Sequence, residues 1–160
     1  MRSLPVDSKD KVALIYNRHF DMVYRVCFAY LKNQADTEDA VSDVFVKLLK
    51  TNTAFENDRH EKAWLTRTAV NLCKDRLKSW WHKREPIDGE VAAENSGFEI
   101  DETLQVVLRL PLRYKDVIVL HYYEGYKTDE IAEILRRPHS TIRNHLSEAR
   151  KLLKGVLENE

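Results

Sequence analysis

Two stretches of the chain carry cationic side chains at the spacing of a single helical face. The first combines cations with an amide and an aromatic ring, at steps of four and three residues: Arg67, Asn71, Lys74, Lys78 and Trp81. Cations neutralise phosphates, an amide recognises a base edge, and an aromatic ring stacks on an unpaired base at roughly 1–3 kcal/mol. The residue types on this face therefore indicate nucleic-acid binding. The alternative is a solvated amphipathic helix whose tryptophans belong to a core.

The second cationic face follows a short helix and a tight turn near the C-terminus. Residues 128–135, TDEIAEIL, are predicted to form the short helix, and Pro138 ends it. A longer helix starts at Ser140 or Thr141, because either hydroxyl can cap it. Its outward positions are Arg143, Asn144, Ser147, Arg150, Lys151 and Lys154. Such a unit is typical of a helix-turn-helix, whose second helix fits the major groove. A helical hairpin without DNA function is the alternative.

Apolar periodicity predicts the helices that position these two faces. In the N-terminal part we expect helices over 12–30, from Thr37 to about residue 49, and from about Glu61 to Arg84. A further helix over 112–124 ends at Gly125, which readily takes the left-handed conformation. Four glycines and four prolines are too few for the regular turns of a β-sandwich or barrel. The predicted fold class is therefore all-α.

The distribution of charge divides the chain into three parts. The net charge of the whole chain is zero, but residues 64–84 and 136–154 each carry +5, which points to two contacts with a polyanion. Residues 85–103 carry seven acids, no base and no helical apolar period. We therefore predict an N-terminal domain over 1–84, an acidic linker over 85–103, and a C-terminal helix-turn-helix domain over 104–160.

The chain has few features of an enzyme, a metalloprotein or a membrane protein. Cys27 and Cys73 form neither a disulfide framework nor a zinc ligand set, and both fall on apolar stripes as core thiols. The six histidines lack ligand spacing, and no Gly-rich phosphate loop occurs. We therefore expect no metal, no cofactor and no enzymatic activity. The strongest apolar stretch, 117–123, is far too short to span a membrane, and the start resembles no signal peptide, so we expect a cytoplasmic location.

Three segments, taken together, resemble one known family. They are DTEDAVSDVFVKLLK at 36–50, KAWLTRTAVNLCKDRLK at 62–78, and the long segment from LPLRYKDVIVLHYYEG to SEARKLL at 110–153. In this order, with an acidic linker before the third, they resemble the bacterial RNA polymerase sigma factors. The likeness is to the small two-domain extracytoplasmic-function (ECF) group of the sigma-70 family. It covers about residues 12–157.

The resemblance implies a transcription initiation factor that binds core RNA polymerase and directs it to promoters. In the family, the acidic second helix binds the polymerase clamp. Its outward positions here are Asp39, Ser42, Asp43 and Val46. Ser42 departs from the glutamine that is usual in the family. The third helix would recognise and melt the −10 element through Arg67, Asn71, Lys74, Arg76, Lys78 and Trp81. Trp80 and Trp81 replace a run of arginines; one is expected in the core and the other as a stacking platform.

The C-terminal helix would recognise the −35 element as duplex DNA. The family positions and their neighbours are Thr141, Arg143, Asn144, Ser147, Glu148, Arg150 and Lys151. Glu148 is a departure, because an acid repels phosphates, although it can accept a hydrogen bond from a cytosine amino group. The resemblance also implies that the linker threads through a basic polymerase channel. The implied partners are core polymerase, promoter DNA as duplex and melted strand, and an anti-sigma factor, with no membrane insertion.

A stand-alone helix-turn-helix regulator is the alternative function. Such a protein would bind duplex DNA without polymerase. It accounts for residues 104–160, but it leaves the cationic face of residues 64–84 and the acidic second helix without a role.

Overall fold

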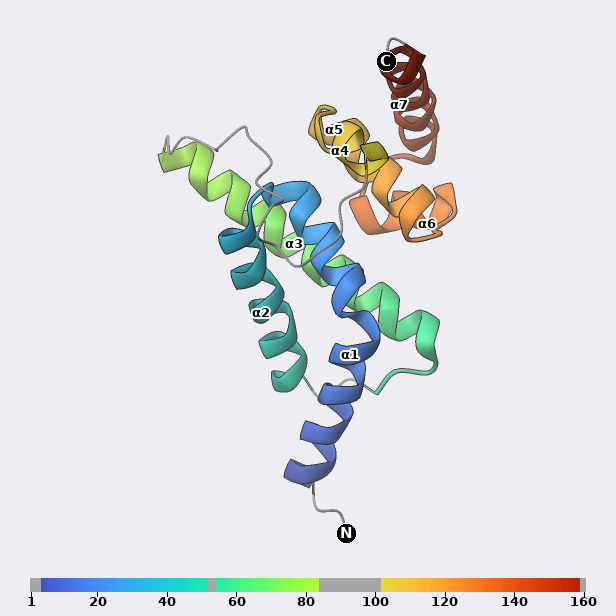
Figure 1. Cartoon of the computed structure of the whole chain (residues 1–160). Helices are drawn as coiled ribbons and strands as arrows, with labels where there is room; N and C mark the ends of the chain where they lie inside the picture. The colour runs from blue at the N-terminus through green and yellow to red at the C-terminus, as the bar shows by residue number, and fades with distance from the viewer. Residues whose placement is uncertain (1–3, 52–53, 84–101, 159–160) are drawn as a thin grey trace.

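The structure is a computed structural model that describes residues 4–51, 54–83 and 102–158, with side chains in 10–51, 54–81 and 102–155. These residues form helices and no strands, so the predicted all-α class is confirmed. In chain order the elements are α1 (Leu4–Leu31), α2 (Gln34–Lys50), α3 (Asp58–Lys83), α4 (Glu102–Leu108), α5 (Leu112–Ile118), the π-helical turn η1 (Val119–Tyr123), α6 (Thr128–Leu135) and α7 (His139–Glu158). Helices α1 to α3 form one group, and α4 to α7 form a second group beside it (Figure 1).

The first domain is a three-helix unit in which α2 and α3 both pack on α1. The apolar stripe of α2 is buried at Ala40, Val44 and Leu48, as the periodicity predicts. On α3 the buried stripe includes Leu65 and Cys73. Some positions of these apolar stripes are less covered. Leu49 is exposed and Leu72 is half-buried, because each lies at the edge of its stripe.

Helix α2 begins three residues earlier than predicted, at Gln34 rather than at Thr37. The cause is Asn33, whose side-chain oxygen accepts a hydrogen bond of 2.8 Å from the backbone N–H of Asp36 and so caps the helix. Lys32, with φ 66°, turns the chain between α1 and α2. Thr37 is therefore buried inside the first turns of α2 instead of standing at its start.

Helices α3 and α7 also start earlier than predicted. Helix α3 starts at Asp58, ahead of the predicted Glu61, because Asn57 Oδ1 accepts a hydrogen bond of 2.8 Å from the backbone N–H of His60. Helix α7 starts at His139, directly after Pro138, and not at Ser140 or Thr141. The carbonyl of Pro138 accepts the first turn's hydrogen bond from the N–H of Ile142 at 3.1 Å.

The second domain contains a helix-turn-helix formed by α6 and α7. Helix α6 spans Thr128–Leu135, as predicted, and Arg136 ends it in the left-handed conformation with φ 56°. Helix α4 begins at Glu102, inside the segment predicted as linker. The rest of that segment, 85–101, lies outside the described residues, as does Arg84.

The helix predicted over 112–124 is interrupted by η1. The N–H of Glu124 donates to the carbonyl of Val119, five residues back, at 3.1 Å. Gly125 follows with φ 76°, a conformation that a residue with a Cβ rarely adopts, so the predicted role of this glycine is confirmed. The extra residue of a π-turn shifts the helical faces of the residues that follow it. Periodicity alone did not predict this turn.

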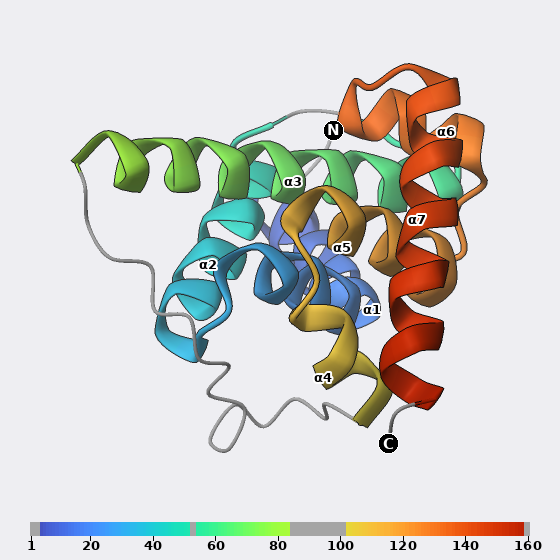
Figure 2. The same cartoon turned by 90° about the horizontal axis from the view of Figure 1, so that it is seen from above.

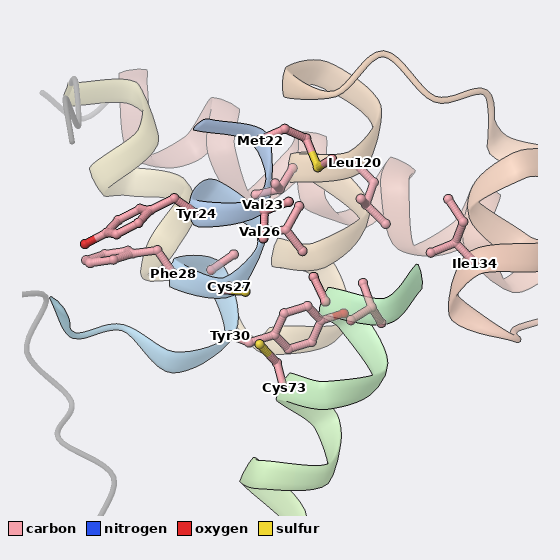
Figure 3. Close-up of a cluster of buried hydrophobic side chains, with 14 of the residues drawn as sticks. Met22, Val23, Tyr24, Val26, Cys27, Phe28, Tyr30, Cys73, Leu120 and Ile134 are labelled. Atoms are coloured by element: carbon pink, nitrogen blue, oxygen red, sulfur yellow. The ribbon is translucent and has the colours of Figure 1, made fainter. Parts of the chain in front are cut away.

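The two domains share one hydrophobic core. Met22, Val23 and Val26 of α1 lie in the same buried cluster as Leu120 of η1 and Ile134 of α6 (Figure 3). Helix α5 contacts α1, and α6 contacts α3. The view from above shows the second domain lying against one side of the α1–α3 group (Figure 2).

Replacing Asn33 by alanine removes the cap of α2. We expect Asn33→Ala to lower the free energy of unfolding by about 1 kcal/mol, because the backbone N–H of Asp36 in the first turn loses its side-chain partner. Urea unfolding followed by circular dichroism measures the change. Asn17→Ala is the control, since Asn17 is exposed inside α1 and caps nothing. An equal loss in both variants would show that Asn33 contributes nothing as a cap.

Candidate DNA and polymerase interfaces

The predicted −10 face of α3 is largely open to solvent. Arg67 and Lys78 are exposed, and Asn71 is half-buried between them. All three follow the steps of four and seven residues that keep side chains on one side of a helix. Arg67 and Lys78 can therefore reach phosphates while the amide of Asn71 lies closer to the helix surface.

The structure separates the roles of the tryptophans. Trp80 is half-buried and packs against the hydrophobic core, whereas Trp81 is 59% exposed. Trp64 is half-buried as well, and its ring centroid lies 5.8 Å from that of Phe55. Of the three, only Trp81 therefore presents most of its ring to solvent, where an unpaired base can stack on it.

Lys74 does not face solvent as freely as its neighbours on the predicted face. Its Nζ donates to the backbone carbonyl of Leu135 at the end of α6, at 3.3 Å. Burial, followed by the nearby Arg137 guanidinium, lowers the pKa of Lys74. Lys74, which was predicted to contact DNA, thus forms a hydrogen bond between the two domains in this structure.

Arg76 points toward α2 rather than along the predicted DNA face. Its guanidinium donates to Asp39 at 3.0 Å and also to Asp43. The physical reason is angular, because Arg76 lies two residues beyond Lys74, about 200° around the helix. Arg76 therefore joins the two acids that were predicted to contact polymerase. These acids are well exposed, so the pairs contribute little to stability.

The outward side of α2 combines charge with apolar surface. Asp39, Ser42 and Asp43 are exposed, and Val46 beside them is 40% exposed. A groove lined by Tyr16, Phe20, Tyr24, Val41 and Phe45 runs between α1 and α2 next to Ser42. An acidic surface next to exposed apolar residues is suited to a protein partner with cationic side chains.

The predicted −35 face of α7 is formed as the periodicity indicates. Exposed positions are Arg143, Asn144, Ser147, Glu148 and Lys151, and Thr141 at the start of the helix is half-buried. The opposite side is buried at Ile142, Leu146 and Ala149. Lys151 Nζ lies 3.4 Å from the Glu148 carboxylate, so this pair reduces the repulsion that Glu148 alone would exert on phosphates.

Arg150 lies at the edge of this face and is held by the π-turn. Its Nε donates to the hydroxyl of Tyr122 at 2.5 Å, and its guanidinium carbon lies 5.5 Å from the centre of the Tyr122 ring. Arg150 and Lys154 also border an apolar groove between α4, η1 and α7, lined further by Val107 and Leu153. In this structure Arg150 is therefore directed at η1 rather than outward with Arg143.

A buried polar cluster under the helix-turn-helix escaped the sequence analysis. Arg137, in the turn between α6 and α7, donates to Asp116 Oδ2 at 2.5 Å and to His145 Nδ1 at 3.3 Å. Tyr30 of α1 donates its hydroxyl proton to the same Asp116 carboxylate at 3.0 Å. Burial raises the pKa of Asp116, and burial with Arg137 lowers the pKa of His145. Periodicity did not single out Asp116, because α5 also carries Arg113 and Lys115.

Lys115, next to Asp116, is buried although it is a lysine. Its exposed fraction is 1%, and its surroundings include Lys32 from the end of α1. Burial, with Lys32 as the second cause, lowers the pKa of Lys115 to about 7. The charged form of this amine is thus costly in the folded chain.

Comparison with known proteins places both groups of helices in one family. The family description "Sigma-70 region 2" matches residues 15–83, and "Sigma-70, region 4" matches residues 100–153. The chain is similar to the RNA polymerase sigma factor SigV of Bacillus subtilis, with 30% identity over 89% of this chain and 88% of that protein. It is also similar to the ECF sigma factor SigW of the same organism, with 28% identity over 94% and 91%.

Solved structures show the same fold. The sigma factor RpoE in complex with the anti-sigma factor NepR, from Bartonella quintana, matches with a TM-score of 0.72, 19% identity, and coverage of 95% of this chain and 97% of that one. CnrH in complex with the cytosolic domain of CnrY matches with a TM-score of 0.66 and 21% identity, over 95% and 90%. In the described residues, no helix is long and apolar enough to cross a membrane.

The chain therefore belongs to the sigma-70 family of RNA polymerase sigma factors, in its ECF group. It is a transcription initiation factor that binds core polymerase and promoter DNA and confers promoter specificity. A stand-alone helix-turn-helix regulator is not favoured, because region 2 and region 4 are both present in the order found in this family. Sigma factors as a family are non-enzymatic.

The low pKa of Lys115 predicts a specific dependence of stability on pH. In the unfolded chain Lys115 keeps its proton up to about pH 10.5, whereas in the folded chain it loses the proton above about pH 7. Burying the charged amine therefore lowers the free energy of unfolding by its full amount below pH 7. This destabilisation disappears as the pH rises toward 10.5. We expect Lys115→Met to raise the free energy of unfolding more at pH 7 than at pH 9. Urea unfolding at both pH values measures the difference.

Lys47→Met is the matched control for this prediction, because Lys47 is exposed on α2. Its effect on the free energy of unfolding should be small and the same at pH 7 and pH 9. If Lys115→Met also had the same effect at both values, the buried amine would not be the source of the pH dependence.

Proposed function

We propose that residues 1–84 bind core polymerase and the −10 element, that 85–103 link the domains, and that 104–160 bind the −35 element. The observation that carries this assignment is the pair of exposed cationic helix faces, one on α3 beside the exposed Trp81 and one on α7. A duplex and a melted strand need different surfaces. The α7 face follows a helix-turn-helix and suits the major groove, whereas Trp81 offers a ring to an unpaired base.

On α3 we propose that Arg67 and Lys78 neutralise phosphates, that Asn71 contacts a base of the melted strand, and that Trp81 stacks. Lys74 joins them once its contact with Leu135 is broken. Arg76 is different, because it is already paired with Asp39 and Asp43. Its proposed role is to pair with these acids in the free chain, and contact with polymerase does not depend on it.

On α7 we propose Arg143 and Asn144 as base contacts, and Ser147 and Lys151 as contacts to the DNA backbone or to neighbouring bases. Thr141 lies in the first turn, where the positive end of the helix dipole favours a phosphate oxygen. We propose that Arg150 breaks its hydrogen bond to the Tyr122 hydroxyl and contacts a phosphate of the DNA instead. Glu148, beside Lys151, is proposed to accept from a cytosine amino group.

We further propose that the protein acts in the cytoplasm by binding alone, without metal, cofactor or catalytic residue. An anti-sigma factor is proposed as its negative regulator. This is supported by the two solved relatives, whose structures are complexes with NepR, an anti-sigma factor, and with the cytosolic domain of CnrY. Co-elution with bacterial core polymerase at moderate salt tests the central function. Failure to co-elute, together with tight binding to duplex DNA by the protein alone, would overturn it.

The acidic side of α2 yields a prediction that separates two roles of Asp43. We expect Asp43→Lys to lower the affinity for core polymerase at least several-fold, because a cation then faces the cationic side chains expected on the partner. Arg76→Ala breaks the same internal ion pair but leaves the charge of Asp43 available. It should therefore keep core affinity within about twofold, measured by fluorescence anisotropy of labelled protein. Equal losses in both variants would assign Asp43 to the fold instead.

The α7 face yields a prediction about sequence recognition. We expect Arg143→Ala to reduce transcription in vitro from the native promoter by the equivalent of about 1–3 kcal/mol, and to have a much smaller effect on a promoter with a permuted −35 sequence. Lys151→Ala is the comparison variant. It should weaken binding to both promoters alike and reduce its salt dependence. If Arg143→Ala affected both promoters equally, Arg143 would be a phosphate contact only.

A further inference from the structure

One histidine of α7 faces the protein on the side opposite the proposed base contacts. His145 lies two residues after Arg143, about 200° around the helix, so it is half-buried while Arg143 and Asn144 are exposed. Helix α5 packs alongside α7 (Figure 2). The ring of His145 meets the ring of Tyr114 on α5 edge to face, with 5.7 Å between their centroids and 82° between their planes. His145 is therefore a contact between α7 and α5.

The turn between α6 and α7 supplies the polar part of this contact. Arg137 donates two hydrogen bonds to the Asp116 carboxylate on α5, at 2.5 and 3.2 Å. It also donates to the backbone carbonyl of Arg113, at 3.1 Å, so its guanidinium is fixed on α5. The same guanidinium lies 3.3 Å from Nδ1 of His145. Arg137 thus bridges the two helices, and the imidazole is its contact on α7.

The groups around His145 favour its neutral form. A guanidinium has donors and no acceptor, so Nδ1 of His145 must accept from Arg137, and the imidazole proton is on Nε2. A second proton, on Nδ1, would replace the acceptor by a donor and place a cation against Arg137. Arg113, whose guanidinium carbon lies 4.6 Å from the centre of the Tyr114 ring, is a further cation on α5. Burial and then Arg137 lower the pKa of His145, and Asp116 opposes this shift.

We propose that His145 is a positioning residue for the −35 face: its neutral imidazole fixes α7 on α5 through Arg137, and its protonation loosens α7. The placement of α7 follows from contacts inside the second domain, whereas its consequence for DNA rests on the proposed function. Apolar packing is not directional, but a hydrogen bond is. Base contacts such as that of Arg143 need side chains held to within about 0.5 Å. Recognition of the −35 element should therefore weaken as the pH falls below about 6.5.

Nuclear magnetic resonance of the full chain tests the placement of α7 without DNA. Imidazole nitrogen shifts should show His145 protonated at Nε2 at pH 7.5. As the pH is lowered to 5.5, backbone amide shifts over 141–151 should move together with the titration of His145. In His145→Asn they should stay nearly constant, because the amide oxygen takes the place of Nδ1 as an acceptor and does not titrate. A proton on Nδ1 at pH 7.5, or equal movement in His145→Asn, would overturn the proposal.

The consequence for DNA is measured on the chain bound to core polymerase. The quantity is the ratio of the affinities for promoter DNA with the native and with a permuted −35 sequence, which cancels the general effect of pH on polymerase and on phosphate contacts. From pH 7.5 to 5.5 this ratio should fall about three- to tenfold for the unaltered chain, and change less than about twofold for His145→Asn. His145→Leu, which removes the acceptor without adding a charge, should give the lowered ratio at both pH values.

His139→Asn is the matched control. His139 also lies on α7, but its Nε2 is 2.7 Å from the hydroxyl of Thr128, a group that can donate or accept. This contact therefore survives protonation, and His139→Asn should keep the pH dependence of the unaltered chain. An equal loss of pH dependence in His139→Asn and His145→Asn would overturn the assignment to His145.

The outcomes separate the positioning role from the proposed function. A native-to-permuted ratio that His145→Leu leaves unchanged would overturn the positioning role, and a ratio that does not fall with pH in the unaltered chain would overturn its pH dependence. Where His145→Leu fails to fold by circular dichroism, His145→Gln replaces it, because its amide lies one carbon farther out, at the position of Nε2. If the α7 amides respond to His145 as expected, but no variant discriminates between −35 sequences at any pH, the placement of α7 is supported and the proposed −35 function is overturned.

Discussion

The burial of the C-terminal part of α1 on all sides is the constraint on which the rest of the structure depends. From Met22 to Leu31 every residue except Arg25 is buried. A helix that is apolar all round must be covered all round. Helices α2 and α3 cover one side, where Tyr24 and Phe28 stack with ring centroids 6.0 Å apart. The remaining side is covered by α5 and η1, so the second domain completes the core of the first (Figure 3).

The cationic residues of this sigma factor divide into those available to partners and those used inside the chain. Arg67, Lys78 and Arg143 are exposed and free to approach phosphates or bases. Lys74 and Arg76, on the same helix as Arg67, are committed to α6 and α2. A count of charge along the sequence treats both groups alike. Their difference arises because helices packed on two sides of α3 supply carbonyl and carboxylate acceptors to the cations that face them.

The π-turn connects the hydrophobic core to the polar contacts between the domains. It places Leu120 in the shared core and presents Glu124 and Tyr126 to α1 and α3. On its outer side it presents Tyr122 to Arg150 of α7. The residues of this irregular turn and those directly after it thus contact α1, α3 and α7. Any separation of the domains changes the surroundings of this turn.

The sequence by itself determined the fold class, the family, the span of α6 and the outward residues of α7, because these follow from local periodicity, turn residues and motif order. It also contained a signal for the packing of the domains, since the run from Met22 to Leu31 is apolar on every face. It did not determine the helix starts set by Asn33 and Asn57, the π-turn, or the partners of Arg76, Lys74 and Asp116. Those were decided by the tertiary structure, because hydrogen bonds between residues such as Tyr30 and Asp116, far apart along the chain, exist only once the helices have packed.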